Sequence, residues 1–98
     1  MEIGKKPWLP SEVAKVNDQA IRIAYFKGEY HWHKHEKEDE LFFVYKGSIT
    51  IKIKDQADIK LNKGEIAVVP KNVEHCPKSK KGAYVLMFES YKLKSKGS

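Results

Sequence analysis

Three of the four histidines stand at alternate positions in the chain, as His31, His33 and His35. In an extended strand this spacing places all three side chains on one face. Glu40 follows five residues after His35, and the fourth histidine, His75, lies 40 residues beyond His35. Imidazole nitrogens with one carboxylate oxygen form a mixed site that suits a divalent first-row transition metal. These residues therefore indicate a metal site, if the fold brings them together.

The alternative is that the histidines lie on the solvent-exposed face of an ordinary strand, where His-x-His is common. The order of the surrounding residues favours the metal site. Gly28 precedes His33-Lys34-His35, four residues separate this pair from Glu40, and six more separate Glu40 from Gly47. This order resembles the first signature motif of the cupin superfamily, although Gly28 lies one residue closer to the first histidine than in the family pattern.

A second stretch resembles the other cupin motif, in which a glycine, Pro-x-Gly and a histidine follow one another. Here Gly64 is followed by five residues, then Pro70-Lys71-Asn72, two residues and His75. Asn72 replaces the glycine of Pro-x-Gly. Asparagine is among the few residues that adopt left-handed backbone conformations at low cost, so the turn is expected to survive.

The resemblance, which covers residues 28–77, implies an all-β fold: a single-domain, cupin-type double-stranded β-helix, or jelly-roll barrel. It implies one divalent metal ion per chain (Fe, Mn, Ni, Co or Zn), held by His33, His35, Glu40 and His75. A register with His31 and His33 as the ligand pair would leave six residues before Glu40, which is too many for the motif.

Strand parity predicts what else faces the metal. If Glu40 points into the barrel, Phe42 and Val44 point inward too, and His31 shares the inward face of His33 and His35. We therefore expect His31, Phe42 and Val44 on the pocket wall. His31 is the one inward base besides the ligands, which makes it the candidate catalytic residue, with an inert pocket or surface residue as the alternative.

The hydrophobic pattern also predicts strands. Ile49, Ile51 and Ile53 alternate with polar residues, whereas residues 41–45 and 84–88 are apolar on both faces, as in strands covered on both sides. Turn signals at short intervals between such segments are typical of an all-β sandwich or barrel. The only helical candidate is one weak turn over residues 11–15, capped by Ser11.

Length and charge limit the remaining possibilities. A chain of 98 residues allows one domain. The net charge is +6, but Arg22 is the only arginine and the lysines are scattered along the chain. This distribution predicts lysines on solvent-exposed strand faces, and the alternative is a nucleic-acid-binding patch. No apolar run approaches the roughly 18 residues of a membrane span, and no secretory signal is recognisable. We expect a soluble cytoplasmic protein that binds neither membrane nor nucleic acid.

We divide the chain into an extended arm that packs on the barrel (residues 1–19), the barrel (residues 20–91) and a flexible basic tail (residues 92–98). Leu41, Phe43 and Tyr45 must point outward once the alternate residues fill the barrel. Monomers seldom expose such a patch. Either the arm around Trp8 and Leu9 or a second subunit covers it, and we favour a homodimer.

The function that these patterns predict is small-molecule binding at a protein-held metal. The cupin resemblance implies a metal-dependent isomerase or dioxygenase, and the alternative is a non-catalytic sensor or accessory module. Cys76, the single cysteine, cannot form an intramolecular disulfide. It is either a small buried apolar residue or a reactive thiol near the metal.

Overall fold

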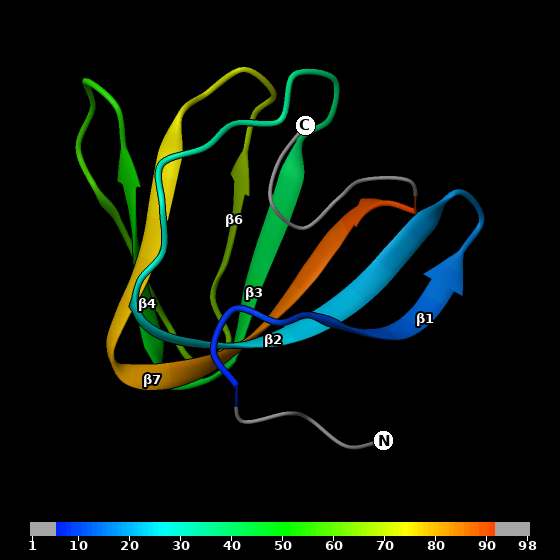
Figure 1. Cartoon of the computed structure of the whole chain (residues 1–98), viewed down its shortest axis with the longest axis horizontal. Helices are drawn as coiled ribbons and strands as arrows, with labels where there is room; N and C mark the ends of the chain where they lie inside the picture. The colour runs from blue at the N-terminus through cyan, green and yellow to red at the C-terminus, as the bar shows by residue number, and fades with distance from the viewer. Residues whose placement is uncertain (1–5, 92–98) are drawn as a thin grey trace.

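The computed structural model describes residues 6–91, which form seven antiparallel strands and no helix (Figure 1). The all-β prediction is confirmed. The strands are β1 (Ser11–Val16), β2 (Gln19–Glu29), β3 (Glu40–Lys46), β4 (Ser48–Ile53), β5 (Ile59–Asn62), β6 (Ile66–Val69) and β7 (His75–Ser90).

The long strand β7 organises the barrel. Its first residues, His75 to Lys78, pair with β4. From Lys78 to Ser90 it pairs with β2, and from Tyr84 to Phe88 it also pairs with β3 on the other side. β1 continues the sheet beyond β2, β6 continues it beyond β3, and β5 pairs with β4. His75 therefore begins the strand that joins both parts of the barrel, so its position is fixed by the whole fold.

Alternation determines the contents of the barrel. On β3 the inward residues Glu40, Phe42 and Val44 are buried, and on β4 the three isoleucines are buried, as predicted. On β7, Ala83, Val85 and Met87 point into the same core. The apolar residues of these three strands form a continuous cluster with Ala24, Phe26, Leu61 and Val69.

The predicted helical turn at residues 11–15 is wrong, because these residues belong to β1. The segment is too short to be a stable helix by itself. Pairing with β2, in which Ser11 lies opposite Ile23 and Val16 opposite Gln19, gives its backbone hydrogen-bonding partners. The expected arm thus contains a strand, and ahead of it Trp8 packs against Phe26 and Tyr30. Residues 1–5 and the predicted tail at residues 92–98 lie outside the described residues.

The outer surface of the sheet is apolar across several strands. One row of neighbours runs from Val68 through Leu41 and Phe88 to Ile21. Beside it, a second row comprises Ile66, Phe43, Leu86 and Ile23. Ile66, Val68 and Phe88 are exposed in the single chain. Ile23 is already buried in the single chain. We call these eight residues the outer apolar face.

Between residues 6 and 91 the structure contains no helix with the length and hydropathy needed to span a membrane.

Candidate metal centre

The segment between β2 and β3 carries three of the four histidines, and backbone hydrogen bonds fix it beside the start of β7. His33 N donates to His75 O (3.0 Å) and His75 N donates to His33 O (2.9 Å). Asn72 N donates to His35 O at 2.8 Å. Asn72 has φ 66°, the left-handed conformation expected at the position where the motif has glycine. The two stretches that resemble cupin motifs are thus joined to each other at the histidines.

The segment is not the continuous strand that the histidine spacing suggested. It forms only an isolated bridge, between His33 and His75. Two further backbone hydrogen bonds hold it, from Tyr30 N to Pro77 O of β7 (3.0 Å) and from Asn72 N in the neighbouring turn to His35 O (2.8 Å). The three histidines consequently do not share one environment: His31 is exposed, His33 is half-buried and His35 is buried.

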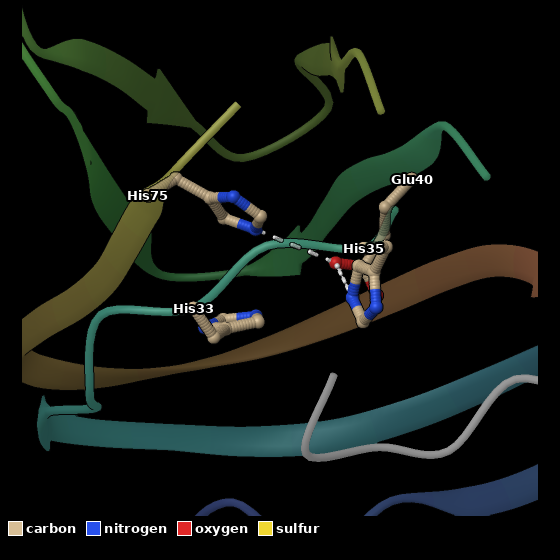
Figure 2. A group of neighbouring side chains, drawn as sticks. All are labelled: His33, His35, Glu40 and His75. Atoms are coloured by element: carbon tan, nitrogen blue, oxygen red, sulfur yellow. Dashed lines mark ion pairs between the residues drawn. The ribbon is translucent and has the colours of Figure 1, made fainter. Parts of the chain in front are cut away.

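Four side chains converge inside the barrel, from the segment before β3, the start of β3 and the start of β7 (Figure 2). One ligand atom from each of His33, His35, Glu40 and His75 lies within 4.8 Å of the other three. Glu40 Oε1 is 3.3 Å from His35 Nε2 and 3.7 Å from His75 Nε2. Three nitrogens and one carboxylate oxygen are therefore arranged around one small volume.

Hydrogen bonds to backbone carbonyls fix two of the imidazoles. The distances are 3.0 Å from His33 Nδ1 to His31 O and 2.8 Å from His75 Nδ1 to Val73 O. A carbonyl oxygen only accepts, so each Nδ1 carries the hydrogen and each Nε2 keeps a free lone pair. Such a bond at the far nitrogen orients a metal-binding histidine and sets its tautomer.

The electrostatics keep the cluster in the form that binds cations. Burial lowers the pKa of His33 to about 4, so this imidazole is neutral at pH 7. Burial alone would raise the pKa of Glu40, but the neighbouring His35, His75 and Glu89 groups outweigh it and lower that pKa well below its usual range. A neutral imidazole and an ionised carboxylate are the protonation states that metal binding requires.

Unsatisfied buried atoms test whether a metal fits this site. His35 Nδ1, His35 Nε2 and His75 Nε2 are buried and have no hydrogen-bond partner. Buried polar atoms are nearly always hydrogen-bonded, and a bound ion is one standard explanation of an exception. A cation bound between the imidazoles would satisfy the two Nε2 atoms. The donor set and its orphaned nitrogens therefore fit a divalent transition metal.

A small cavity of about 30 Å³ adjoins the cluster and is lined by His33 and Glu40. Phe42 lies on its wall, as predicted, but the lining residues include neither His31 nor Val44. Val44 is fully buried in the apolar cluster instead. The ring of His31 stacks against Tyr30, with 3.9 Å between ring centroids. What His31 supplies to the cluster is its backbone carbonyl.

Sequence reasoning missed Glu89, which lines the same cavity and is 1% exposed. Arg22 Nη1 donates to Glu89 Oε1 at 2.8 Å. Burial and the adjacent Glu40 raise the pKa of Glu89 to about 8, although Arg22 opposes the shift. The signal was present in the sequence, because strand alternation places Glu89 on the face of β7 that carries Val85 and Met87.

Cys76 is buried and adjacent to His75 in β7. Strand alternation turns its side chain away from the face that carries His75. Burial raises the pKa of its thiol. A buried thiol with a raised pKa is mostly unreactive, which favours a structural role for Cys76.

Comparison with known proteins agrees with this geometry. The family model described as cupin domain matches residues 24–90. The chain therefore belongs to the cupin family. It is 36% identical to a cupin-2 domain protein of Shewanella frigidimarina, with a TM-score of 0.85 over 89% of this chain and 84% of that one.

Two further proteins resemble the chain. The crystal structure of NMB1881 from Neisseria meningitidis is 29% identical, with a TM-score of 0.81 over 88% of this chain and 87% of that one. The uncharacterised protein YdbB of Bacillus subtilis is 39% identical over 68% of this chain. That alignment spans only 59% of the length of YdbB.

Proposed function

We propose that the chain binds one divalent transition-metal ion through His33, His35, Glu40 and His75 and uses it to hold a small molecule in the adjoining cavity. The observation that supports this proposal is the set of orphaned histidine nitrogens beside an ionised carboxylate. A bound metal would act there as a Lewis acid and as a template for the ligand. Four protein ligands leave room for a further coordination position in a five- or six-coordinate ion.

The protein residues around the metal define the rest of the site. His33 and Glu40 lie on the cavity wall and would present the ion to a ligand there. The burial of His35 and His75 excludes water from the other side of the cluster. Metal-dependent isomerisation, dioxygenation and non-catalytic sensing are each compatible with such an arrangement. The binding function is accordingly our conclusion, and turnover by the reconstituted protein separates the two enzymatic roles from the sensor.

Metal reconstitution tests the proposal directly. Chelator-treated protein is loaded in turn with Fe(II), Mn(II), Co(II), Ni(II) and Zn(II), desalted and subjected to elemental analysis. We expect about one ion per chain for at least one metal, with strong loss in His75→Ala. Stoichiometry near zero for all five metals would show that the cluster is not a metal site.

We further propose that a second copy of the chain covers the outer apolar face. Of the two arm residues expected to cover it, Trp8 packs against Phe26, a residue of the barrel core, and Leu9 is exposed. Burial of each large apolar side chain contributes roughly 1.5–3 kcal/mol, enough to favour association. Light scattering during size exclusion should give about twice the mass of 11.3 kDa. Val68→Asp should shift the protein to the monomer, and a wild-type monomer at micromolar concentration would contradict the proposal.

A further inference from the structure

A second hollow, of about 640 Å³, lies on the outer side of β4, where that strand pairs with the start of β7 at the left of Figure 1. None of the four residues of the metal cluster lines it. Its volume lies within the range of roughly 300–1,000 Å³ that is usual for small-molecule sites. We call it the lysine groove, after its lining residues Lys60, Lys78, Lys80 and Lys81.

The strand register places two of these lysines on either side of Thr50. Lys60 of β5 and Lys78 of β7 are both direct cross-strand neighbours of Thr50, which belongs to β4 between them. Directly opposite residues in antiparallel strands share a face of the sheet, with roughly 4.5–5.5 Å between their Cβ atoms. The two lysine side chains therefore flank the side chain of Thr50, and the hydrogen bonds of the sheet fix the spacing of all three residues.

A bulge in β7 supplies the other two lysines, Lys80 and Lys81. At this point three residues of β7 lie opposite a single residue of β2. The hydroxyl of Ser79 holds the bulge, because it accepts a hydrogen bond from Gly82 N at 3.2 Å and donates one to Ser48 O at 2.7 Å. Both lysines are consequently exposed, although successive residues of a regular strand would point to opposite faces. Bulges of this kind re-aim side chains and are common next to binding sites.

The groove carries positive charge that the protein itself does not neutralise. In the part of the chain that the structure describes, none of its four lysines forms an ion pair. Of the two acids in the lining, Glu29 is paired with Lys52 at 3.0 Å, so Asp58 alone faces the four lysines. Ser48 and Thr50 each keep a hydroxyl without a hydrogen bond among the same described residues. Unpaired ammonium and hydroxyl groups that share one hollow are donors for an anion with several charges.

We propose that the lysine groove binds a small molecule through two or more of its phosphate groups. Lysine ammonium groups bind phosphate oxygens as point charges, and the hydroxyls of Ser48 and Thr50 donate to further oxygens. A nucleic acid fits the groove less well, because the described lining residues include no aromatic ring on which a base could stack and no arginine that could read one. This site is separate from the metal cluster and does not depend on it.

Titration calorimetry with sodium tripolyphosphate tests the groove. The full chain is first treated with chelator and desalted, because tripolyphosphate would otherwise compete for any bound metal. We expect saturable binding of about one tripolyphosphate per chain near neutral pH. The affinity should fall at least about tenfold when sodium chloride is raised from about 20 mM to about 200 mM, because salt screens exposed charges.

Matched variants locate the binding. Lys60→Gln/Lys80→Gln removes one lysine from β5 and one from β7, both at exposed positions where folding does not depend on them. It should bind tripolyphosphate about tenfold more weakly, since an exposed charge pair contributes about threefold. Lys37→Gln/Lys71→Gln makes the same change in net charge at exposed positions outside the groove and should change the affinity less than about twofold. Thr50→Val removes a donor without changing the charge and should weaken binding about threefold.

The outcomes are independent of the metal experiments. Absence of saturable binding to the wild-type protein would overturn the proposal. Equal losses in the two double variants, or full affinity in Thr50→Val, would show attraction by net charge alone and would also overturn it. Oligothymidylate that displaces tripolyphosphate and binds more tightly would assign the groove to single-stranded nucleic acid instead. Binding that weakens only in the groove variants supports the proposal, even if the protein binds no metal.

Discussion

Two regions of the barrel differ in how completely their buried polar groups are hydrogen-bonded. Near the apolar core, the buried hydroxyl of Ser79 donates to Ser48 O at 2.7 Å and accepts from Gly82 N at 3.2 Å, so its hydrogen bonds are complete. In the metal cluster and beside it, His35, His75 and Glu89 are equally buried, yet each retains an atom without a hydrogen-bond partner. The same chain thus satisfies one buried polar side chain fully and leaves three incomplete.

This difference distinguishes the residues that stabilise the fold from the residues that its function requires. Apolar burial favours folding, whereas an unpaired buried polar atom costs free energy. Unpaired atoms gathered around one small volume are explained if something outside the chain completes them. Burial of the apolar core therefore offsets the free-energy cost of the unpaired polar atoms in the metal-free cluster.

The largest expected effect comes from breaking the apolar core. Ile51 is fully buried, and Ile51→Ala should lower the free energy of unfolding by about 2–5 kcal/mol. Metal affinity of the folded variant should not change, because Ile51 is not among the ligands. Chemical denaturation of metal-free protein measures the first quantity and metal titration the second. Val13→Ala, at an exposed position of β1, should change stability by less than about 0.5 kcal/mol.

Substitution of a residue in the metal cluster should have the opposite pattern, with a large effect on metal binding and a small effect on the stability of the metal-free protein. At a metal concentration 100 times the dissociation constant, binding should stabilise wild-type protein by about 2.7 kcal/mol. Glu40→Gln keeps the shape of the side chain but removes its charge. If it weakens binding about 100-fold, the stabilisation at that concentration falls to about 0.4 kcal/mol. Thermal unfolding with and without metal measures this loss, and a variant stabilised as much as wild type would remove Glu40 from the ligand set.

The pH dependence of metal-free protein sharpens the comparison at Glu89. Its pKa is about 8 in the folded protein, against 4.5 ordinarily. The folded state therefore keeps a proton that the unfolded chain releases in this range, and stability falls as pH rises from 4.5 to 8, by at most about 1.4 kcal/mol per pH unit.

Glu89→Gln removes this titration. The difference in unfolding free energy between wild type and variant should change from about pH 5 to pH 8 and become constant above about pH 9. His33, whose pKa is lowered to about 4, makes stability fall as pH drops from 6.5 to 4. Both proteins contain His33, so its contribution cancels in the comparison. If the curves of unfolding free energy against pH for wild type and variant were parallel from pH 5 to pH 8, Glu89 would not be the group that keeps a proton in the folded state.

The sequence predicted the residues whose positions depend on strand alternation. Phe42 and Val44 are buried and Tyr45 is exposed, because alternation along a paired strand leaves little choice. The clustering of His33 with His75 was accessible only through the resemblance to cupin motifs. No rule of local structure brings two segments 42 residues apart into one backbone bridge.

The failures have physical causes as well. Residues 11–15 looked weakly helical because local propensity carries no information about the partner strand, β2. His31 was placed on the pocket wall by treating residues 31–35 as a regular strand, whereas hydrogen bonds to Asn72 and His75 shape that segment. Glu89 was overlooked because no motif contains it, although its inward parity on β7 was readable.

The smallest expected effect belongs to His31. Its side chain is exposed, and the group that supports the cluster is its carbonyl oxygen, which accepts the hydrogen bond from His33 Nδ1 at 3.0 Å. His31→Ala keeps that carbonyl, so metal affinity should change less than about twofold and stability by less than about 0.5 kcal/mol. Metal titration of His31→Ala beside His35→Ala checks the assignment, with a large loss of affinity expected only in the second. The reverse result, loss in His31→Ala and retention in His35→Ala, would show that His31 and His33 form the ligand pair and that the segment before β3 adopts a different register when metal binds.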